Sequence, residues 1–458
     1  MKTDVVIVGA GPSGIATAAC LNSFSIPNVV IEKEECIASL WKNKAYDRLK
    51  LHLAKQFCSL PLMPHSGDTP MFIPKDEFIR YLDDYVKHFM INPVFCTEVV
   101  SATFSETSNT WSVISRNKIT GEVNEYMSNF LVVATGENSE GIIPEIPGLE
   151  SFPGEVMHSS LYKSGTGFTG KSVLVVGCGN SGMEIAYDLS NFGAITSISI
   201  RSPFHVMSKE MIYLGMVLVK YLPVKVVDEL LLMLARFKYG DLSKYGIVRP
   251  KNGPLTIKAS TGKSAVIDVG TVDKIKTGEI KVVKGLLSIE GTEVLFSDGK
   301  SDDFDAIVFA TGYKSTANNW LKPSTVGSQG LVVAGGGEKK GKGGSLSPGI
   351  LGIVGMIVEI EGNGGSPFGI VGMVGNGIEG IGGNVAAGTV GFGREGKGGS
   401  WVAGIVGIVG IVGIVGCDGV ASGAAGVSRR WRAAWPALHS NALTSKARRN
   451  HLWEAMSI

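Results

Sequence analysis

The stretch DVVIVGAGPSG, residues 4–14, decides the fold of this chain. Its apolar run from Val5 to Val8 is typical of a buried parallel strand, and the glycines that follow have the spacing G-x-G-x-x-G. Such glycines let the backbone turn tightly and approach a pyrophosphate, which then lies against the N–H groups that open the next helix. We predict that helix over residues 13–24 and a dinucleotide-binding site before it. The glycine pattern alone also occurs in ordinary turns.

The end of the next predicted strand, NVVIE at residues 28–32, supports the dinucleotide site. Glu32 lies about twenty residues after the first glycine, where a carboxylate binds the 2'-hydroxyl of a ribose. A carboxylate there suits FAD or NAD and repels the 2'-phosphate of NADP.

A second copy of the pattern is KSVLVVGCGNSGMEIAYDL, residues 171–189. A strand is predicted over residues 172–176 and a helix up to about residue 191. In place of the acid, this copy has Arg201, whose guanidinium can pair with the 2'-phosphate of NADP. The alternative is a solvated surface arginine. Two sites of opposite preference imply FAD at the first and NADPH at the second.

Two apolar strands run into the tripeptide Ala-Thr-Gly, in FLVVATGENSE at 130–140 and AIVFATGYKS at 306–315. Glycine gives a turn at the carboxyl end of a strand, where α/β folds place their ligands. We expect these stretches to be crossings between two nucleotide domains; ordinary strand ends are the alternative.

Composition indicates a globular protein of two or three domains that acts on small molecules. The 458 residues are 44% hydrophobic and carry a formal net charge of +2, which argues against nucleic acid or an anionic membrane as the main partner. The six cysteines form no CxxC pair, so neither a zinc site nor a disulfide framework is indicated. The first 25 residues lack the pattern of a secretory signal, and a cytoplasmic location is expected.

The tail from residue 327 to 458 is a different kind of sequence, with repeats such as GIVGIVGIVGIVG. Glycine at every third position has neither helix nor strand periodicity and a large backbone entropy cost, so we expect low-complexity, disordered chain or the product of an intron or frame shift near residue 323. Residues 402–417 are apolar but shorter than the roughly 20 residues of a membrane span. The basic end, residues 428–453, could bind nucleic acid or membrane, but no folded motif supports this.

Residues between the two glycine loops match the pattern F-x-G-x-x-x-H-x-x-x-Y, with Phe152, Gly154, His158 and Tyr162. With segments such as GDLSKYGIVRPKNGP and DFDAIVFATGYKS, the chain resembles the class B flavin monooxygenases, and within them the plant YUCCA enzymes, over roughly residues 1–322. The resemblance implies an α/β fold of two dinucleotide-binding (Rossmann-like) domains, with the NADPH domain inserted into the FAD domain. We expect the FAD domain at 1–165, the NADPH domain at 166–315, and the start of a return to the FAD domain at 316–326.

The resemblance also implies an activity. NADPH reduces FAD, oxygen adds to give a flavin C4a-peroxide, and the peroxide attacks the ketone of indole-3-pyruvate, which loses carbon dioxide and leaves the auxin indole-3-acetate. Alternatives are N- or S-oxygenation, an NADPH oxidase that releases hydrogen peroxide, and an inactive relative that lacks the closing FAD segment. Peripheral association with the endoplasmic reticulum is an open alternative for its location, and the oligomeric state is not predicted.

Two histidines are candidates for the site. No second histidine or carboxylate lies at a metal-ligand spacing from His158 in the sequence, so a metal site is not expected. We interpret His158 as part of a linker that positions NADPH rather than as a catalytic base. His52, where many relatives have an asparagine, is predicted to line the peroxide pocket, and a satisfied core histidine is the alternative. Lys55 is a second catalytic candidate, and residues 203–250 form either a substrate lid or ordinary packed helices.

The residues expected to contact the two cofactors are drawn from both glycine loops, the strand ends and the motif between them. They are Gly9, Gly11, Pro12, Ser13, Gly14, Glu32, Trp41, Thr135, Gly136, His158, Gly177, Gly179, Asn180, Ser181, Gly182, Arg201, Thr311 and Gly312.

Overall fold

The computed structural model describes residues 1–105 and 107–321, together with the backbone of 331–333. The chain forms two compact units. The first contains residues 1–39, 55–137 and the described residues from 315 onward, and the second contains 40–54 and 138–314. Residues 40–54 and 138–165, which the sequence-based boundary places in the first domain, thus have their contacts in the second unit; the boundary at 165 stays a prediction.

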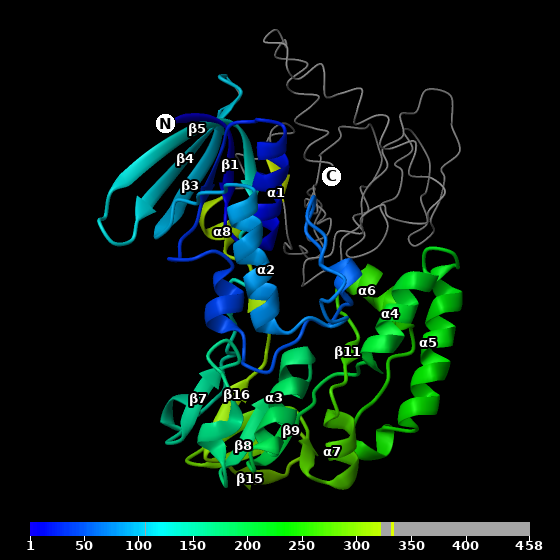
Figure 1. The fold of residues 1–458 in the computed structure, drawn as a ribbon. Coiled ribbons are helices and arrows are strands. Elements are labelled where there is room, and N and C mark those ends of the chain that lie inside the picture. The colour runs from blue at the N-terminus through cyan, green and yellow to red at the C-terminus, as the bar shows by residue number, and fades with distance from the viewer. Residues whose placement is uncertain (106, 322–330, 334–458) are drawn as a thin grey trace. The chain divides into compact units, whose positions relative to one another are not determined.

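The first unit is built on a six-stranded sheet in the order β2-β1-β5-β4-β3, with β18 paired to β5 (Figure 1). β1 runs parallel to β2 and β5, whereas β3, β4 and the first half of β5 form an antiparallel meander. The bounds are β1 Lys2–Val8, β2 Asn28–Ile31, β3 Thr97–Ser105, β4 Thr110–Asn117, β5 Val123–Val133 and β18 Leu331–Val333. The four residues Val5 to Val8 of β1 are buried, as a central parallel strand requires.

Strand β18 is a difference from the sequence analysis. It pairs parallel with β5, Leu331 opposite Leu131 and Val333 opposite Val133, so the chain adds a strand to the first sheet beyond residue 326. The apolar tripeptide is too short to show periodicity among glycines, and only long-range pairing reveals it. The remaining tail expectations, and Cys417, lie outside the described residues.

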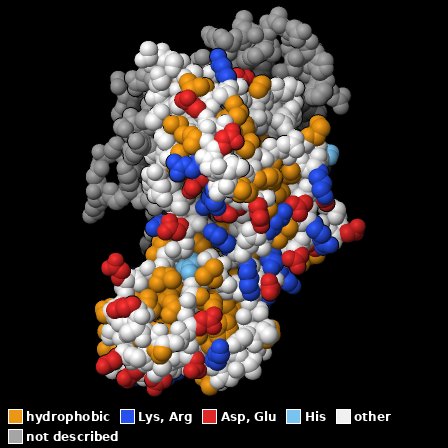
Figure 2. Space-filling view, turned by 90° about the vertical axis from the view of Figure 1, so that its left-hand side faces the viewer, with side chains coloured by type: hydrophobic (Ala, Val, Ile, Leu, Met, Phe, Trp, Pro, Cys, Tyr) orange, Lys and Arg blue, Asp and Glu red, His pale blue; other side chains and the backbone are white. Residues whose placement is uncertain are grey.

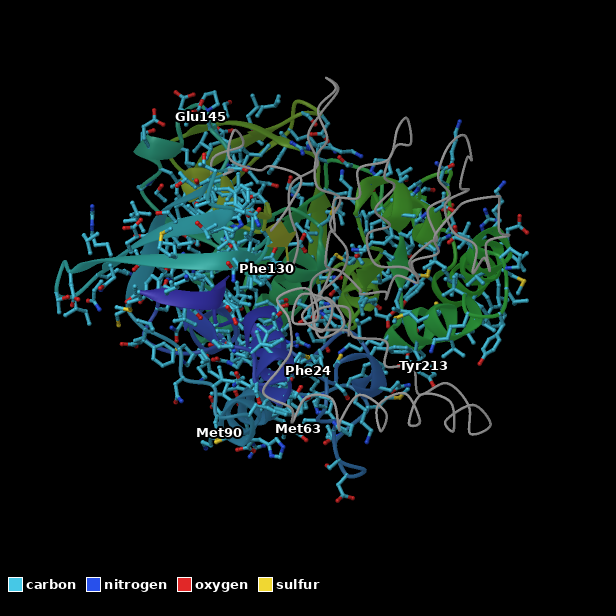
Figure 3. The ribbon with its side chains drawn as sticks, turned by 90° about the horizontal axis from the view of Figure 1, so that it is seen from above. Phe24, Met63, Met90, Phe130, Glu145 and Tyr213 are labelled. Atoms are coloured by element: carbon cyan, nitrogen blue, oxygen red, sulfur yellow. The ribbon has the colours of Figure 1, made fainter. Side chains whose placement is uncertain are left out.

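Helices α1 Pro12–Ser23, α2 Lys75–His88 and α8 Ala317–Trp320 complete the first unit, with a short 3-10 turn at Lys55–Phe57. α1 starts one residue earlier than predicted, because proline is well suited to the first helical position. α2 buries Phe78, Leu82 and Tyr85, as its periodicity predicts. Figure 3 labels Phe24, which directly follows the last residue of α1, and Met90, which lies two residues after the end of α2.

The second unit is built on a five-stranded, fully parallel sheet in the order β12-β9-β8-β16-β7 (Figure 1). Its strands are β7 Glu155–His158, β8 Ser172–Val176, β9 Ile195–Ser199, β12 Ile280–Val283 and β16 Ala306–Phe309. Strand β16 buries all four of its residues and β8 buries its three middle ones, Val173 to Val175, which is why both are near-continuous apolar runs.

Smaller elements surround this sheet. The helices are α3 Asn180–Asn191, α4 Lys209–Leu218, α5 Val224–Tyr239, α6 Pro254–Thr261 and α7 Thr271–Thr277, with short helical turns at Leu40–Lys44, Leu149–Ser151, Gly165–Phe168 and Ser243–Tyr245. The short strands are β6 Glu140–Gly141, β10 Val206–Met207, β11 Val266–Ile267, β13 Leu286–Glu290, β14 Glu293–Phe296, β15 Ser301–Asp303 and β17 Tyr313–Lys314.

The stretch proposed as a lid, residues 203–250, contains α4 and α5. Val227, Leu231 and Ala235 of α5 are buried in the core of the second unit, while Phe237 is almost fully exposed. This helix is therefore anchored by packing along one face, and a lid function stays a prediction.

The surface mixes charges of both signs on the face shown in Figure 2, in keeping with the small net charge. Among the described residues, no helix combines the length and the apolar character needed to cross a membrane. Within the same residues, no three histidine, cysteine or acidic side chains gather so that they could hold a metal ion.

Candidate functional site

The first glycine loop is shaped by backbone packing. Gly9 has φ +108°, and a Cβ placed on it would lie 2.5 Å from the carbonyl oxygen of Ala134, at the end of β5. A Cβ on Gly14 would overlap the carbonyl oxygen of Gly9, so α1 packs directly on the loop. A Cβ on Gly11, at the N-cap of α1, would meet nothing within 4 Å. Gly9 and Gly14 are therefore required by close packing within the protein. Gly11 leaves open space before the helix, and that space fits a pyrophosphate.

The second loop repeats this arrangement position by position in the second unit. Gly177 has φ +109°, and its Cβ would lie 2.5 Å from the carbonyl oxygen of Ala310, at the end of β16. A Cβ on Gly182 would overlap the carbonyl oxygen of Gly177, and one on Gly179 would meet nothing within 4 Å. In both units the alanine of an Ala-Thr-Gly stretch is the residue that presses on the first glycine. These stretches therefore help to shape the loops, a role that the sequence did not reveal.

Glu32 holds the first loop in shape. Its buried carboxylate accepts hydrogen bonds from the backbone N–H of Ala10 at 2.6 Å and of Glu34 at 3.0 Å. Burial raises the pKa of Glu32, and these two N–H donors oppose the rise. A carboxylate can accept about four hydrogen bonds, so capacity for a ribose hydroxyl remains. The predicted contact with a ribose stays a prediction.

Arg201 stands at the corresponding place in the second unit, two residues after the end of β9. It is exposed, and no hydrogen bond or ion pair to another described residue involves its guanidinium. Burial raises the pKa of the Cys178 thiol in the glycine loop to about 11, and the charge of Arg201 partly opposes the rise. A cation beside the loop and open to solvent fits a 2'-phosphate.

The remaining loop residues shape the two helix starts and the strand ends. Pro12 opens α1, and the Ser13 carbonyl accepts from the Thr17 hydroxyl. Asn180, beside Ser181 in the first turn of α3, accepts from the N–H of Ile267 at 2.8 Å and so ties α3 to β11.

Both Ala-Thr-Gly turns need glycine at their last position. Gly136 has φ +75° and Gly312 has φ +92°, a backbone region that other residues rarely adopt. Thr135 precedes the first of these glycines, and the hydroxyl of Thr311 donates to the carbonyl of Ile142. The contacts of these residues with a cofactor stay predictions.

The motif from Phe152 to Tyr162 includes strand β7 of the second sheet. Phe152 is part of a buried apolar cluster, and a Cβ on Gly154 would overlap the carbonyl oxygen of Asp305, which explains the glycine. The Tyr162 hydroxyl donates to the buried Asp188 carboxylate on α3 at 2.7 Å. The motif thus fastens β7 and the chain after it to the rest of the unit.

His158 ends β7 and is buried. Its Nε2 donates to the carbonyl of Gly312 at 3.0 Å, and its Nδ1 accepts from the N–H of Ser160 at 3.1 Å. Burial is the main cause that lowers the pKa of His158, so the imidazole is held neutral in one tautomer. These contacts agree with a positioning role, because they hold the Ala-Thr-Gly turn at Gly312.

His52 belongs to the second unit and is paired there. Its Nε2 lies 2.8 Å from Oε1 of Glu184 on α3, and both side chains are largely buried, at 13% and 3% exposure. The pairing matches the alternative of a satisfied buried histidine, and a place beside a flavin peroxide stays a prediction. Trp41, also in the second unit, is buried in the turn Leu40–Lys44.

Lys55 belongs to the first unit. Its ammonium donates to the carbonyls of Ser66, Gly67 and Thr69, at 3.1, 2.7 and 2.7 Å. The structure therefore gives Lys55 a role in holding the loop at 66–69; a catalytic role stays a prediction.

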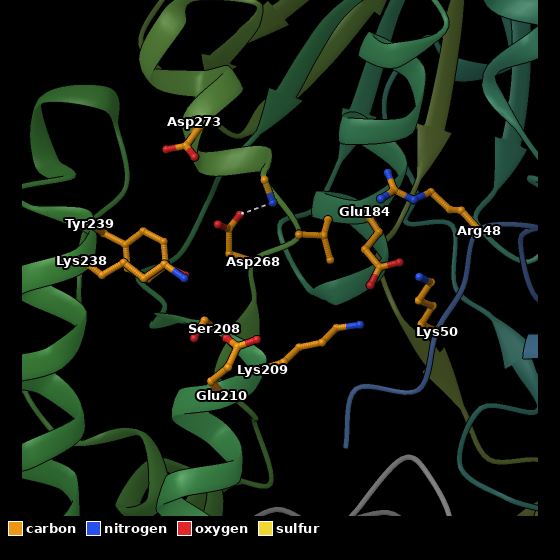
Figure 4. Close-up of a pocket in the computed structure, with 12 residues that line it drawn as sticks. Arg48, Lys50, Glu184, Ser208, Lys209, Glu210, Lys238, Tyr239, Asp268 and Asp273 are labelled. Carbon is orange, nitrogen blue, oxygen red and sulfur yellow. Dashed lines mark hydrogen bonds between the residues drawn. The ribbon is translucent and has the colours of Figure 1, made fainter. Parts of the chain in front are cut away.

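The sequence analysis missed a polar pocket of about 500 Å³ in the second unit (Figure 4). Arg48, Lys209, Glu184, Tyr239 and Asp268 are among its lining residues. The one local signal is Glu184, an acid among the buried residues of α3 in the run MEIA. The other residues come from separate segments that only the fold brings together.

Comparison with known proteins settles the family. The model of the family described as "FMO-like: Flavin-binding monooxygenase-like" matches residues 2–330. This chain belongs to that flavin-binding monooxygenase family. It is an NADPH-dependent flavin monooxygenase with FAD and NADPH as cofactors, as the two loops predict.

Arabidopsis thaliana has similar members of the family. The chain is 59% identical to "Probable indole-3-pyruvate monooxygenase YUCCA10" over 323 residues, which cover 70% of this chain and 84% of the relative. It is 49% identical to "Indole-3-pyruvate monooxygenase YUCCA6" over 336 residues, which cover 71% of this chain and 80% of the relative.

Solved structures share the fold. An open crystal structure of cyclohexanone monooxygenase aligns with a TM-score of 0.57 at 19% identity, covering 71% of this chain and 77% of that one. A crystal structure of OTEMO in complex with FAD and NADP aligns with a TM-score of 0.57 at 18% identity, covering 71% and 75%. The predicted α/β fold with two dinucleotide-binding domains is confirmed.

Proposed function

We propose that this monooxygenase converts indole-3-pyruvate to indole-3-acetate in auxin biosynthesis. The observation that carries the proposal is the 59% identity to the Arabidopsis relative named as a probable indole-3-pyruvate monooxygenase, over 84% of that relative. In the reaction the bond between the carboxylate and the keto carbon breaks and carbon dioxide leaves. One atom of O₂ enters the new carboxylate, and the other becomes water with the hydride of NADPH and a proton.

FAD supplies the oxygen-activating chemistry and NADPH the hydride when they are bound. The chain's own residues hold and select them. The open positions at Gly11 and Gly179 admit the two pyrophosphates, Glu32 favours an unphosphorylated ribose, and Arg201 favours the 2'-phosphate. His158 keeps the turn at Gly312 in place without taking a proton.

We expect a cytoplasmic enzyme, with peripheral association to the endoplasmic reticulum as an alternative, whose substrates are a small keto acid and molecular oxygen. Strand β18 supports an active enzyme over an inactive relative, because the chain past residue 326 still pairs with β5 of the first sheet.

The test uses the full-length chain purified with FAD in the buffer. We expect visible flavin absorbance that stays with the protein, NADPH oxidation that depends on indole-3-pyruvate, and about one indole-3-acetate per NADPH by mass spectrometry. Indole-3-lactate, which has a hydroxyl in place of the ketone, is the matched control and should give no product. A colourless protein, or NADPH consumption that yields only hydrogen peroxide, would contradict the proposal.

A further inference from the structure

The polar pocket of the second unit is built from five parts of the chain. Its walls are segment 40–54, helix α3, the start of α4, the end of α5 and the loop that leads into α7. A volume of about 500 Å³ is in the range of small-molecule sites. Four basic and four acidic residues are among the twelve that line it, so it suits a polar ligand.

The charges are not evenly mixed. In Figure 4, Arg48, Lys50 and the end of Lys209 gather around Glu184, while Asp268, Asp273 and Tyr239 lie on the opposite side. The Glu184 carboxylate already pairs with Nε2 of His52 at 2.8 Å. It is therefore the one acidic group beside the three cations Arg48, Lys50 and Lys209 in this part of the pocket lining. This cationic end, defined as Arg48, Lys50 and Lys209, has an excess of positive charge that an anion would neutralise.

The Arg48 guanidinium is fixed by an aromatic ring and has an unused hydrogen-bond donor. Its guanidinium carbon lies 4.3 Å from the centre of the Tyr187 ring on α3, a cation–π contact that fixes the plane of the group. Its Nη1 is buried and has no hydrogen-bond partner among the described residues. A buried N–H without an acceptor is destabilising, and the planar fork of arginine matches a carboxylate.

A second cation also favours a bound anion. Burial lowers the pKa of Lys209, so its charged form would gain from a nearby anion. Across the pocket the hydroxyl of Tyr239 is buried beside the Asp268 carboxylate, so an acceptor already stands at that end. An unsatisfied buried N–H, such as that of Arg48, is expected of a site that a polar molecule completes.

The lining residues argue against a phosphate of NADPH as the anion. The glycine loop from Gly177 to Gly182 and the cation Arg201 are where NADPH phosphates are expected, and none of them lines the pocket. A separate ligand therefore has to supply the charge, and a 2-oxo acid has one carboxylate beside its reacting ketone.

We propose that the cationic end of this pocket binds the carboxylate of the 2-oxo acid substrate, with Arg48 as the residue that selects for it. The inference rests on the proposed function for the identity of the substrate. Lys50 and Lys209 raise the local positive potential, and Arg48 supplies the paired N–H donors.

The experiment measures binding by calorimetry on the full-length holoenzyme, so it does not depend on turnover. The probes are indole-3-acetate and indole-3-acetamide, which have nearly the same shape and differ in charge. We expect the acetate to bind at least tenfold more tightly to the wild type, and Arg48→Met to remove most of that ratio, since a charge-assisted hydrogen bond is worth about a tenfold to hundredfold change. Arg48→Lys should retain part of it.

The control Lys225→Met removes a positive charge from an exposed site on α5 and should leave the ratio unchanged. A second arm adds saturating NADP⁺: continued binding of indole-3-acetate supports a separate carboxylate site, whereas competition assigns the cations to a phosphate and overturns the proposal. It is equally overturned if neither probe binds, or if a folded Arg48→Met protein keeps the wild-type ratio.

Failure of the proposed function looks different. In that case indole-3-pyruvate yields no indole-3-acetate, while phenylacetate and phenylacetamide, or the indole pair, still show the charge preference and its loss in Arg48→Met. Kinetics add an independent readout, since Arg48→Met should raise KM for the oxo acid more than it lowers kcat.

Discussion

Substitution of the two glycines Gly179 and Gly182 separates cofactor binding from protein stability. At Gly179 an added Cβ meets no atom within 4 Å, and the backbone, with φ −71° and ψ −175°, is open to alanine. We therefore expect Gly179→Ala to change the free energy of unfolding by less than about 1 kcal/mol. The methyl group instead enters the space assigned to the pyrophosphate, and NADPH affinity should fall at least tenfold, or about 1.4 kcal/mol.

Gly182 is the opposite case, because its Cβ would overlap the carbonyl oxygen of Gly177. Neither partner can move aside as a flexible side chain would, since the atom struck is backbone. Overpacking of this kind costs about 1–3 kcal/mol, and the better helix propensity of alanine offsets about 1 kcal/mol. We expect Gly182→Ala to lower Tm, by roughly 2–4 °C for each net kcal/mol lost.

The assay is thermal unfolding of both variants without cofactor, followed by calorimetric titration with NADPH. Gly179→Ala should keep the wild-type Tm and lose affinity, and Gly182→Ala should lose Tm. Equal losses of Tm in the two variants, or wild-type NADPH affinity in Gly179→Ala, would refute the assignment of the open space.

Three more predictions follow from the second unit. Arg201→Ala should weaken NADPH at least tenfold and leave NADH unchanged, with Arg201→Lys intermediate; equal effects on the two nucleotides, measured by titration, would remove Arg201 from the phosphate site. Glu184→Met should lower the free energy of unfolding by roughly 1.5–3 kcal/mol, because it removes the hydrogen-bond partner of His52. Denaturant unfolding of the Glu184→Met and His52→Leu single and double variants should show losses that do not add. Strictly additive losses would mean that the two residues are not coupled. Burial lowers the pKa of His158, so the contribution of its neutral form to stability is complete above the ordinary pKa of 6.5 and is lost as pH falls toward the lower folded pKa. Tm should drop over that pH window, and the drop should be smaller in His158→Gln. An identical pH profile of Tm in the two proteins would exclude His158 as a source of the pH dependence.

The sequence predicted what is local. Strand β8 begins and ends where its apolar run does, and the tight turns at Gly9 and Gly177 follow from the glycine spacing, because each depends on a few adjacent residues. The packing of those glycines against Ala134 and Ala310 is distant along the chain and was not predicted. The sequence did not predict that residues 40–54 belong to the second unit. Their anchors are contacts distant along the chain, such as the Asp47 N–H to the Lys163 carbonyl at 3.0 Å and the Arg48 guanidinium on Tyr187.

The pocket could not be found for the same reason. Arg48 and Lys209 are ordinary basic residues in sequence, and neither has a spacing that indicates a site. Their significance comes from their place in the pocket beside the carboxylate of Glu184, which the order of residues does not encode in any short pattern.

The two glycine loops also bear on how such an enzyme can be altered. In each unit the cradle is fixed by main-chain atoms, the carbonyls of Ala134 and Ala310 pressing on a glycine, so its shape does not depend on which side chains stand nearby. We expect nucleotide preference to reside in a separate residue after the next strand, Glu32 in the first unit and Arg201 in the second. An engineer can therefore exchange the reductant by replacing residues around position 201 while leaving the cradle untouched, and natural variants can diverge along the same route.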